Sequence, residues 1–155
     1  MALEANLVAE FDELAKNYPE KRAIMMLALH RLQDARGWLS PDSLEDLAGY
    51  LGMEPVEVYG VASFYPMYRL RPCGKHVVSI CHNISCDLRG AQDIVAAACE
   101  ATGAPLHGTS PDGKFTVTTV ECAGACANAP MFDLDGTYHE DLTPEKAKQI
   151  LRSVK

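Results

Sequence analysis

The chain has 155 residues, of which 48% are hydrophobic and 23% charged, a composition that predicts a folded protein of about one domain and excludes disordered and low-complexity classes. Its 14 Lys and Arg residues against 21 Asp and Glu residues give a formal net charge of −7, with a pI of about 5.1. This acidic balance argues against binding to nucleic acid or to anionic lipid, so we expect a protein partner or a small ligand.

The sequence also argues against a membrane span and a secretory signal. Its longest strictly apolar run, residues 23–29, has seven residues, whereas a membrane helix needs about 20. The beginning of the chain carries Glu4, Glu10 and Asp12, and these acids disfavour a signal or transit peptide. We therefore expect a cytosolic chain of bacterial type with no direct membrane insertion.

The first 70 residues predict a helical bundle, beginning with two helices. Apolar residues recur at helical spacing over residues 3–14, and this first helix ends before Pro19. A second helix is predicted over residues 19–36 and stops at Gly37. Its apolar run, residues 23–29, suggests burial between neighbouring helices.

Two further helices of the bundle are predicted from their N-terminal signals. Ser40 is a typical N-cap, and Pro41 follows it at the first helical position, so a third helix is expected to run to Leu51. Pro55 opens a fourth helix that is predicted to end near Ser63.

From Pro72 onward the pattern changes to strands mixed with helices. The predicted order is β-α-β-β-α, which makes the fold class α/β (α+β), and the boundary with the bundle is placed in residues 66–72. Asp135-Gly136 is a strong hairpin turn signal. The predicted strands are 76–80, 115–120, 131–134 and 137–139, and the predicted helices are 88–100, capped by Asp87, and 144–154, capped by Thr143.

Six cysteines are the unusual feature of the composition. In a reducing cytosol, clustered cysteines are more often metal ligands or redox catalysts than disulfides. Cys81 and Cys86 follow the first predicted strand, and Cys122 and Cys126 follow the second. The ends of adjacent strands lie within roughly 5 to 10 Å of each other, so both pairs can converge on one site. Four thiolates at one point predict an iron–sulfur cluster or a zinc site.

Three details favour iron–sulfur, although spacing alone leaves structural zinc and the absence of any metal open. Asp87, as the cap of the predicted helix, would aim backbone N–H groups at an anionic cluster. Gly124 permits a tight loop between Cys122 and Cys126. Neither pair has the two-residue spacer common in zinc sites. There is no C-x-x-C dithiol motif, and Arg89 stands where the plant ferredoxin run has its third cysteine.

Other polar and aromatic residues receive structural interpretations. Cys99 is expected to be a small buried residue, Cys73 an exposed thiol or contact residue, and His82 a loop residue that could alternatively tune a cluster. Residues 108–114 mimic a phosphate-binding loop, but Phe115 replaces the required Ser or Thr, so a turn is predicted. The aromatic residues expected to be core, with partner anchoring as the alternative, are Trp38, Tyr59, Phe64, Tyr65 and Tyr68.

Three strings of residues resemble a known family. They are Gly60-Val-Ala-Ser-Phe-Tyr65, Cys81-His-Asn-Ile-Ser-Cys86-Asp-Leu-Arg-Gly-Ala91 and Glu121-Cys-Ala-Gly-Ala-Cys126-Ala-Asn-Ala-Pro130. Through them nearly the whole chain resembles the thioredoxin-like [2Fe–2S] subunit (E-type) of NADH:quinone oxidoreductase, respiratory complex I. The resemblance implies a thioredoxin-like [2Fe–2S] ferredoxin domain at residues 72–155, preceded by an N-terminal helical bundle at residues 1–71 that docks the partner.

The resemblance also implies the cofactors. One [2Fe–2S] cluster would be held by Cys81, Cys86, Cys122 and Cys126, with the first pair on one iron and the second pair on the other. The cluster would accept an electron from FMN on a flavoprotein subunit that also binds NADH, within a larger multi-subunit redox complex. Neither FMN nor NADH is expected on this chain, and no independent catalysis is expected. Ala123 departs from the Leu that the family often has, without touching a ligand.

The motifs leave the parent complex open. Closely related subunits occur in NAD-linked hydrogenases and formate dehydrogenases, and a free-standing thioredoxin-like ferredoxin or a zinc-stapled adaptor is a further alternative. We expect a cytoplasmic location, peripheral to the inner membrane through the complex. The net charge of −7 predicts a docking partner of complementary charge and an association that weakens as salt rises.

Overall fold

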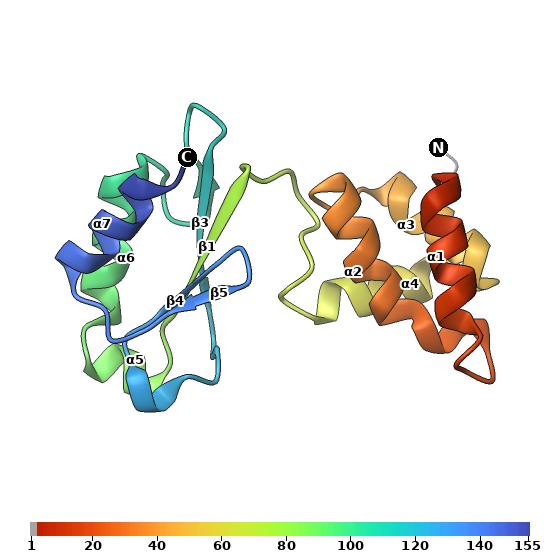
Figure 1. Cartoon of the computed structure of the whole chain (residues 1–155), viewed down its shortest axis with the longest axis horizontal. Coiled ribbons are helices and arrows are strands. Elements are labelled where there is room, and N and C mark those ends of the chain that lie inside the picture. The colour runs from red at the N-terminus through yellow and green to blue at the C-terminus, as the bar shows by residue number, and fades with distance from the viewer. Residues whose placement is uncertain (1–2) are drawn as a thin grey trace. The chain divides into compact units, whose positions relative to one another are not determined.

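A computed structural model describes residues 3–155 and shows two compact units, the first ending at Pro72 and the second running from Cys73 to Lys155. The first unit is helical, and the second is built on a five-stranded sheet (Figure 1). Each unit has a hydrophobic core of its own. Within residues 3–155, no helix has the length and apolar character needed to cross a membrane.

The helices of the first unit begin where local capping signals place them. The Ser40 hydroxyl accepts a hydrogen bond from the Ser43 N–H at 3.1 Å, as expected of an N-cap followed by proline. A capping box between Glu54 and Glu57 opens the next helix. The elements are α1 (Ala5–Ala15), the 3₁₀ helix η1 (Lys21–Ile24), α2 (Met25–Arg36), α3 (Pro41–Leu51) and α4 (Pro55–Phe64).

The second predicted helix differs from the structure in two ways. Its first turn is the 3₁₀ helix η1, and the regular α-helix begins only at Met25. The expectation that the apolar run is buried between neighbouring helices holds only for part of it, because Ala23 is exposed and Leu27 is 41% exposed. With 3.6 residues per turn, only one face of α2 reaches the core, and Ala28 and Leu29 lie on that face.

Hydrogen bonds from buried side chains attach the segment after α4 to α2. The side-chain amide of Gln33, only 6% exposed, donates to the Met67 carbonyl at 3.1 Å and accepts from the Arg69 N–H at 2.6 Å. The Tyr68 hydroxyl donates to the Met26 carbonyl at 2.9 Å. The two Gln33 bonds satisfy backbone groups of a segment that has no regular secondary structure to pair them, and the Tyr68 bond ties the same segment to the backbone of α2.

The second unit is a mixed sheet of strand order β2-β3-β1-β4-β5. β1 pairs with β3 in parallel and with β4 antiparallel, and β5 completes a hairpin with β4. The two-residue strand β2 was not predicted, because a run so short carries no periodic signal. The strands are β1 (His76–Cys81), β2 (Gly108–Thr109), β3 (Phe115–Val120), β4 (Phe132–Leu134) and β5 (Thr137–His139), and the helices are α5 (Ile84–Leu88), α6 (Ala91–Thr102), the 3₁₀ helix η2 (Cys126–Asn128) and α7 (Pro144–Ser153).

The core of this unit lies between the sheet and two helices. Helices α6 and α7 lie side by side against one face of the sheet (Figure 1). Val78 and Val117 sit opposite each other in the register and are fully buried in that core. Alternate positions such as Ser79, Thr116 and Thr118 belong to the other face and are only partly buried. This alternation is the period of two of a sheet covered on one side.

The helix predicted over residues 88–100 corresponds to α6, which begins only at Ala91, whereas Leu88 ends a separate short helix, α5. Asn83 caps α5, its side-chain oxygen accepting from the Ile84 N–H at 2.7 Å, and α6 begins after Gly90, whose φ is +89°. Asp87 lies inside α5, so its predicted role as an N-cap is wrong. A residue with a left-handed backbone conformation cannot continue an α-helix. Glycine adopts this conformation readily, so Gly90 separates the two helices.

The predicted hairpin is confirmed at Asp135 and Gly136, whose φ angles of +52° and +87° are those of a tight two-residue turn. The Asp135 carboxylate accepts from the Val77 N–H at 2.8 Å and lies 2.6 Å from the His76 ring. The hairpin is thereby tied to the beginning of β1. Residues 110–113 form a turn before β3, as predicted for the segment that mimics a phosphate-binding loop.

Candidate metal centre

The two cysteine pairs lie at one edge of the sheet. Cys81 is the last residue of β1 and pairs with Val120, the last residue of β3. Because the two strands are parallel, their C-terminal ends meet, and Cys122 follows directly in the loop after β3. Cys86 lies on α5 and Cys126 begins η2. The structure thus brings the two loops together as the sequence predicted.

The four cysteine side chains form one connected group. The Cys86 and Cys122 thiols lie close enough to Cys81 to lower its pKa by interacting with its thiolate, so Cys81 links the two pairs. Cys86 in turn lies close enough to Cys126 to respond to its charge. Cys81 and Cys86 are each only 2% exposed, whereas Cys122 and Cys126 are exposed. A group bound here would be covered on the first pair's side and accessible on the second pair's side.

Backbone N–H groups point at the sulfur atoms. The N–H groups of Asn83 and Ala123 donate to the Cys81 sulfur. The Met131 N–H donates to the Cys86 sulfur, and the Gly124 N–H donates to the Cys122 sulfur at 3.4 Å. Donors of this kind stabilise thiolates and, in iron–sulfur proteins, tune the reduction potential.

The two buried thiols have opposite tendencies to ionise. Burial disfavours the Cys81 thiolate, but the hydrogen bonds to its sulfur outweigh burial, and the pKa of Cys81 lies below its ordinary value. Burial, together with the hydrogen bond and negative charge of Cys81, raises the pKa of Cys86 to about 11. Two thiols this close cannot both ionise easily, so a second thiolate needs a cation.

The donor set fits a [2Fe–2S] cluster. Four thiolates supplied as two pairs satisfy two irons, and soft sulfur ligands suit iron–sulfur clusters. No group of three or more His, Cys, Asp or Glu side chains within residues 3–155 is arranged to hold a single metal ion. A cluster of two irons does not require all the ligands to meet at one ion, because each iron takes its own pair.

The remaining candidate residues lie in less specific surroundings. Cys99 is half-buried on α6 against the sheet core, rather than fully buried as expected, and burial raises the pKa of its thiol. Cys73 is half-buried at the beginning of the second unit, so of the two expectations the fully exposed thiol is wrong, and the contact residue stays a prediction. His82 lies in the loop after β1, with its Nε2 atom 3.6 Å from the Glu121 carboxylate.

Three residues near the cysteines were not predicted from the sequence. The Tyr138 hydroxyl on β5 donates to the Ala123 carbonyl, between Cys122 and Cys126, at 2.9 Å. Ile84 and Leu88 lie on α5 and are 73% and 82% exposed. No local pattern marks Tyr138, because its contact depends on the pairing of β5 with β4, but Ile84 and Leu88 have the i, i+4 spacing of one helix face.

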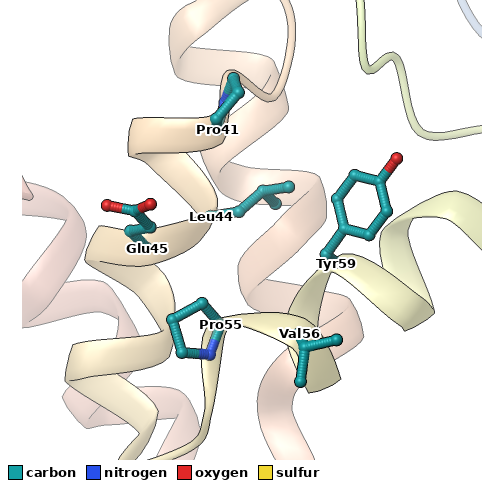
Figure 2. A pocket seen from close by; sticks show the side chains of 6 residues that line it. All are labelled: Pro41, Leu44, Glu45, Pro55, Val56 and Tyr59. Carbon is teal, nitrogen blue, oxygen red and sulfur yellow. The ribbon is translucent and has the colours of Figure 1, made fainter.

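The first unit carries a separate apolar groove between α3 and α4, with a volume of about 270 Å³. Leu44 forms its buried part and points toward Tyr59, which is 54% exposed, while Val56 is 73% exposed (Figure 2). Of the aromatic residues considered in the sequence, Tyr68 is buried as expected, but Phe64 is 77% exposed. The groove is lined by Pro41, Leu44, Glu45, Pro55, Val56 and Tyr59.

Comparison with known proteins identifies the class of fold. The family model of the thioredoxin-like [2Fe-2S] ferredoxins matches residues 11–155. The chain therefore belongs to the thioredoxin-like [2Fe–2S] ferredoxin family, and the predicted family and fold class are confirmed. Membership implies a [2Fe–2S] cluster, in agreement with the donor set at the edge of the sheet.

The curated relatives are subunits of one kind of complex. The chain is 36% identical over 143 residues to the E-type subunit of NADH-quinone oxidoreductase from Rickettsia bellii, covering 90% of this chain and 86% of the relative. It is 37% identical over 146 residues to NADH-quinone oxidoreductase subunit 2 of Thermus thermophilus, covering 93% and 81%.

A solved structure shares the fold. The crystal structure of the air-oxidized NAD⁺-reducing [NiFe]-hydrogenase matches with a TM-score of 0.68 and 21% identity over 79% of this chain. The match spans only 22% of the hydrogenase chain. At this identity the likeness shows a common fold alone.

Proposed function

We propose that this chain is an electron-transfer subunit of NADH:quinone oxidoreductase, carrying one [2Fe–2S] cluster on Cys81, Cys86, Cys122 and Cys126. The observation that carries the proposal is the connected group of four cysteine side chains where the parallel strands β1 and β3 end. The similarity to curated NADH-quinone oxidoreductase subunits supports this parent complex.

The residues of the chain have defined tasks in this proposal. Cys81 and Cys86 hold one iron, and Cys122 and Cys126 hold the other. The amide groups that donate to the sulfur atoms offset part of their negative charge. When bound, a [2Fe–2S] cluster takes up or gives up one electron at a time. FMN and NADH belong to the partner flavoprotein, and this chain performs no catalysis alone.

The flavoprotein partner would approach the accessible side of the cysteine group. Exposed Ile84 and Leu88 lie on α5, the same short helix that carries Cys86. Large exposed apolar side chains beside a site are typical of a contact surface, so we propose that the partner packs against them. Residues 1–71 would supply further docking surface, including the groove between α3 and α4. The chain would then be peripheral to the membrane through its complex.

Substitution of single cysteines tests the ligand assignment. Iron and sulfide are supplied to the full-length chain, and iron content, visible absorption and the electron paramagnetic resonance signal of the reduced protein are measured. We expect Cys122→Ser to abolish or strongly perturb the cluster, whereas Cys73→Ser and Cys99→Ser should leave it unchanged. An intact signal in Cys122→Ser would contradict the assignment. A colourless, zinc-containing protein would favour the zinc alternative, because Zn²⁺ has a filled d shell.

Purification of the native protein tests the partner. We expect the chain to elute with an FMN-containing flavoprotein and a quinone-reducing module. Elution as a single chain that still carries iron would favour a free-standing ferredoxin. A hydrogenase or formate dehydrogenase module in the same fraction would replace the parent complex proposed here while leaving the cluster assignment intact.

A further inference from the structure

Tyr138 makes a specific contact with the loop between Cys122 and Cys126. It lies on β5 and is 51% exposed, yet its hydroxyl donates a hydrogen bond of 2.9 Å to the Ala123 carbonyl. Tyr138 pairs with Asp133 of β4 in the hairpin register. The phenol is therefore carried by a regular strand, while the group it binds belongs to an irregular loop.

The carbonyl that Tyr138 binds is part of the peptide between Ala123 and Gly124. The N–H of that same peptide, on Gly124, donates to the Cys122 sulfur at 3.4 Å. In a trans peptide the C=O and the N–H point in opposite directions within one plane. A hydrogen bond at each end therefore determines the rotation of the plane, and the bond at the oxygen polarises the N–H toward the sulfur.

The Gly124 side of this peptide is exposed. Gly124 has a φ of +79°, and a Cβ added there would meet no heavy atom within 4 Å. Gly124 therefore has no side chain through which packing could hold its part of the peptide, whereas Ala123 packs against the buried residues around Cys81. The preceding N–H, on Ala123, donates to the Cys81 sulfur, so rotation of the loop would disturb donors to both cysteines.

We propose that Tyr138 is a positioning residue that orients the Ala123–Gly124 peptide, so that the Gly124 N–H stabilises negative charge on the Cys122 sulfur. The inference rests on the proposed function, because it concerns the cluster assigned to these cysteines. Reduction by one electron increases the negative charge on the ligand sulfurs, and an N–H donor strengthens with that charge. Tyr138 therefore acts to raise the reduction potential of the site.

Removing only the hydroxyl tests the role of Tyr138. The full-length Tyr138→Phe variant is loaded with iron and sulfide, and its reduction potential is measured by a redox titration followed by visible absorption. A hydrogen bond that strengthens a neighbouring charge-assisted hydrogen bond by about 10–30% changes the equilibrium constant of one-electron reduction by about 1.3-fold to 4.6-fold. The expected result is a lower potential, by roughly 7–39 mV, since tenfold corresponds to 59 mV.

Tyr18→Phe is the matched control, because it makes the same change at an exposed tyrosine of the first unit. Its potential should equal that of the wild type, as should the thermal unfolding midpoints of both variants. The potential is taken from the loaded fraction, so partial loading does not hide the result. Equal potentials in wild type and Tyr138→Phe would overturn the inference while leaving the proposed function intact. Failure of the wild type to form a cluster would overturn both.

Discussion

Replacement of Gln33 by methionine should destabilise the first unit through two backbone groups. The Gln33 side-chain amide pairs with the Met67 carbonyl at 3.1 Å and with the Arg69 N–H at 2.6 Å, from a position only 6% exposed. Methionine has a similar length and volume, so Gln33→Met removes both hydrogen bonds while leaving no large cavity. The carbonyl and the N–H are then left without their protein partner.

The size of the effect follows from the number of groups left unpaired. Each buried donor or acceptor without a partner costs about 1–3 kcal/mol, and water can reach part of this segment because Met67 is 43% exposed. The lower half of that range, about 1–2 kcal/mol, applies to each of the two groups, so the expected loss is about 2–4 kcal/mol. For a unit of this size, a loss of 1 kcal/mol lowers the melting temperature by about 4–8 °C.

The single tryptophan gives an assay that reports on this unit alone. Trp38 follows α2 in the first unit, so its fluorescence during urea denaturation follows the unfolding of that unit. Gln92→Met is the matched control, since Gln92 is exposed on α6 of the second unit. The Trp38 transition should move to lower urea in Gln33→Met and stay in place in Gln92→Met. A loss below about 0.5 kcal/mol would refute the reasoning, because water would then satisfy both groups.

Two further predictions concern backbone space and pH. In Gly74→Ala the new Cβ would lie 2.8 Å from the Phe115 carbonyl carbon, so we expect the free energy of unfolding to fall by about 1–3 kcal/mol. Gly49 lies in an open position of α3, so Gly49→Ala should raise the free energy of unfolding by about 0.5–1 kcal/mol. Thermal denaturation measures both changes. Burial raises the pKa of Tyr50 to about 12, aided by its hydrogen bond to Asp12. The contribution of this neutral hydroxyl to stability is therefore present below about pH 10, the ordinary pKa of tyrosine, and is lost as the pH rises toward 12. Phenylalanine does not ionise, so in urea titrations Tyr50→Phe should lose less stability than the wild type between about pH 9 and pH 11. Equal losses in the two proteins would contradict this origin of the pH dependence.

Much of the fold follows from local signals. The caps at Ser40 and Thr143 and the turn at Asp135-Gly136 were predicted because each depends on residues within a few positions of one another. The main strands, β1 and β3, were predicted because apolar and β-branched residues gather in runs of the right length. Such features need no knowledge of distant parts of the chain.

Errors arose where local signals compete. Asp87 was predicted to cap one helix, but Asn83 caps the short helix α5, and Gly90 separates α5 from α6. The apolar run in α2 suggested burial between neighbouring helices, although packing against only some neighbours left Leu27 exposed. The first error lies in a local conformation at Gly90, whereas the second depends on tertiary contacts, which outweigh propensities worth a fraction of a kcal/mol.

By itself, the sequence determined the two cysteine pairs, their places after two strands and the family to which the chain belongs. Only the tertiary structure decided that Cys81 contacts both Cys86 and Cys122, because parallel pairing of β1 with β3 brings together residues far apart in sequence. It also decided which backbone N–H groups point at sulfur, and that the Tyr138 hydroxyl reaches the peptide of Gly124. Hydrogen bonds depend on distance and direction, and long-range pairing sets both.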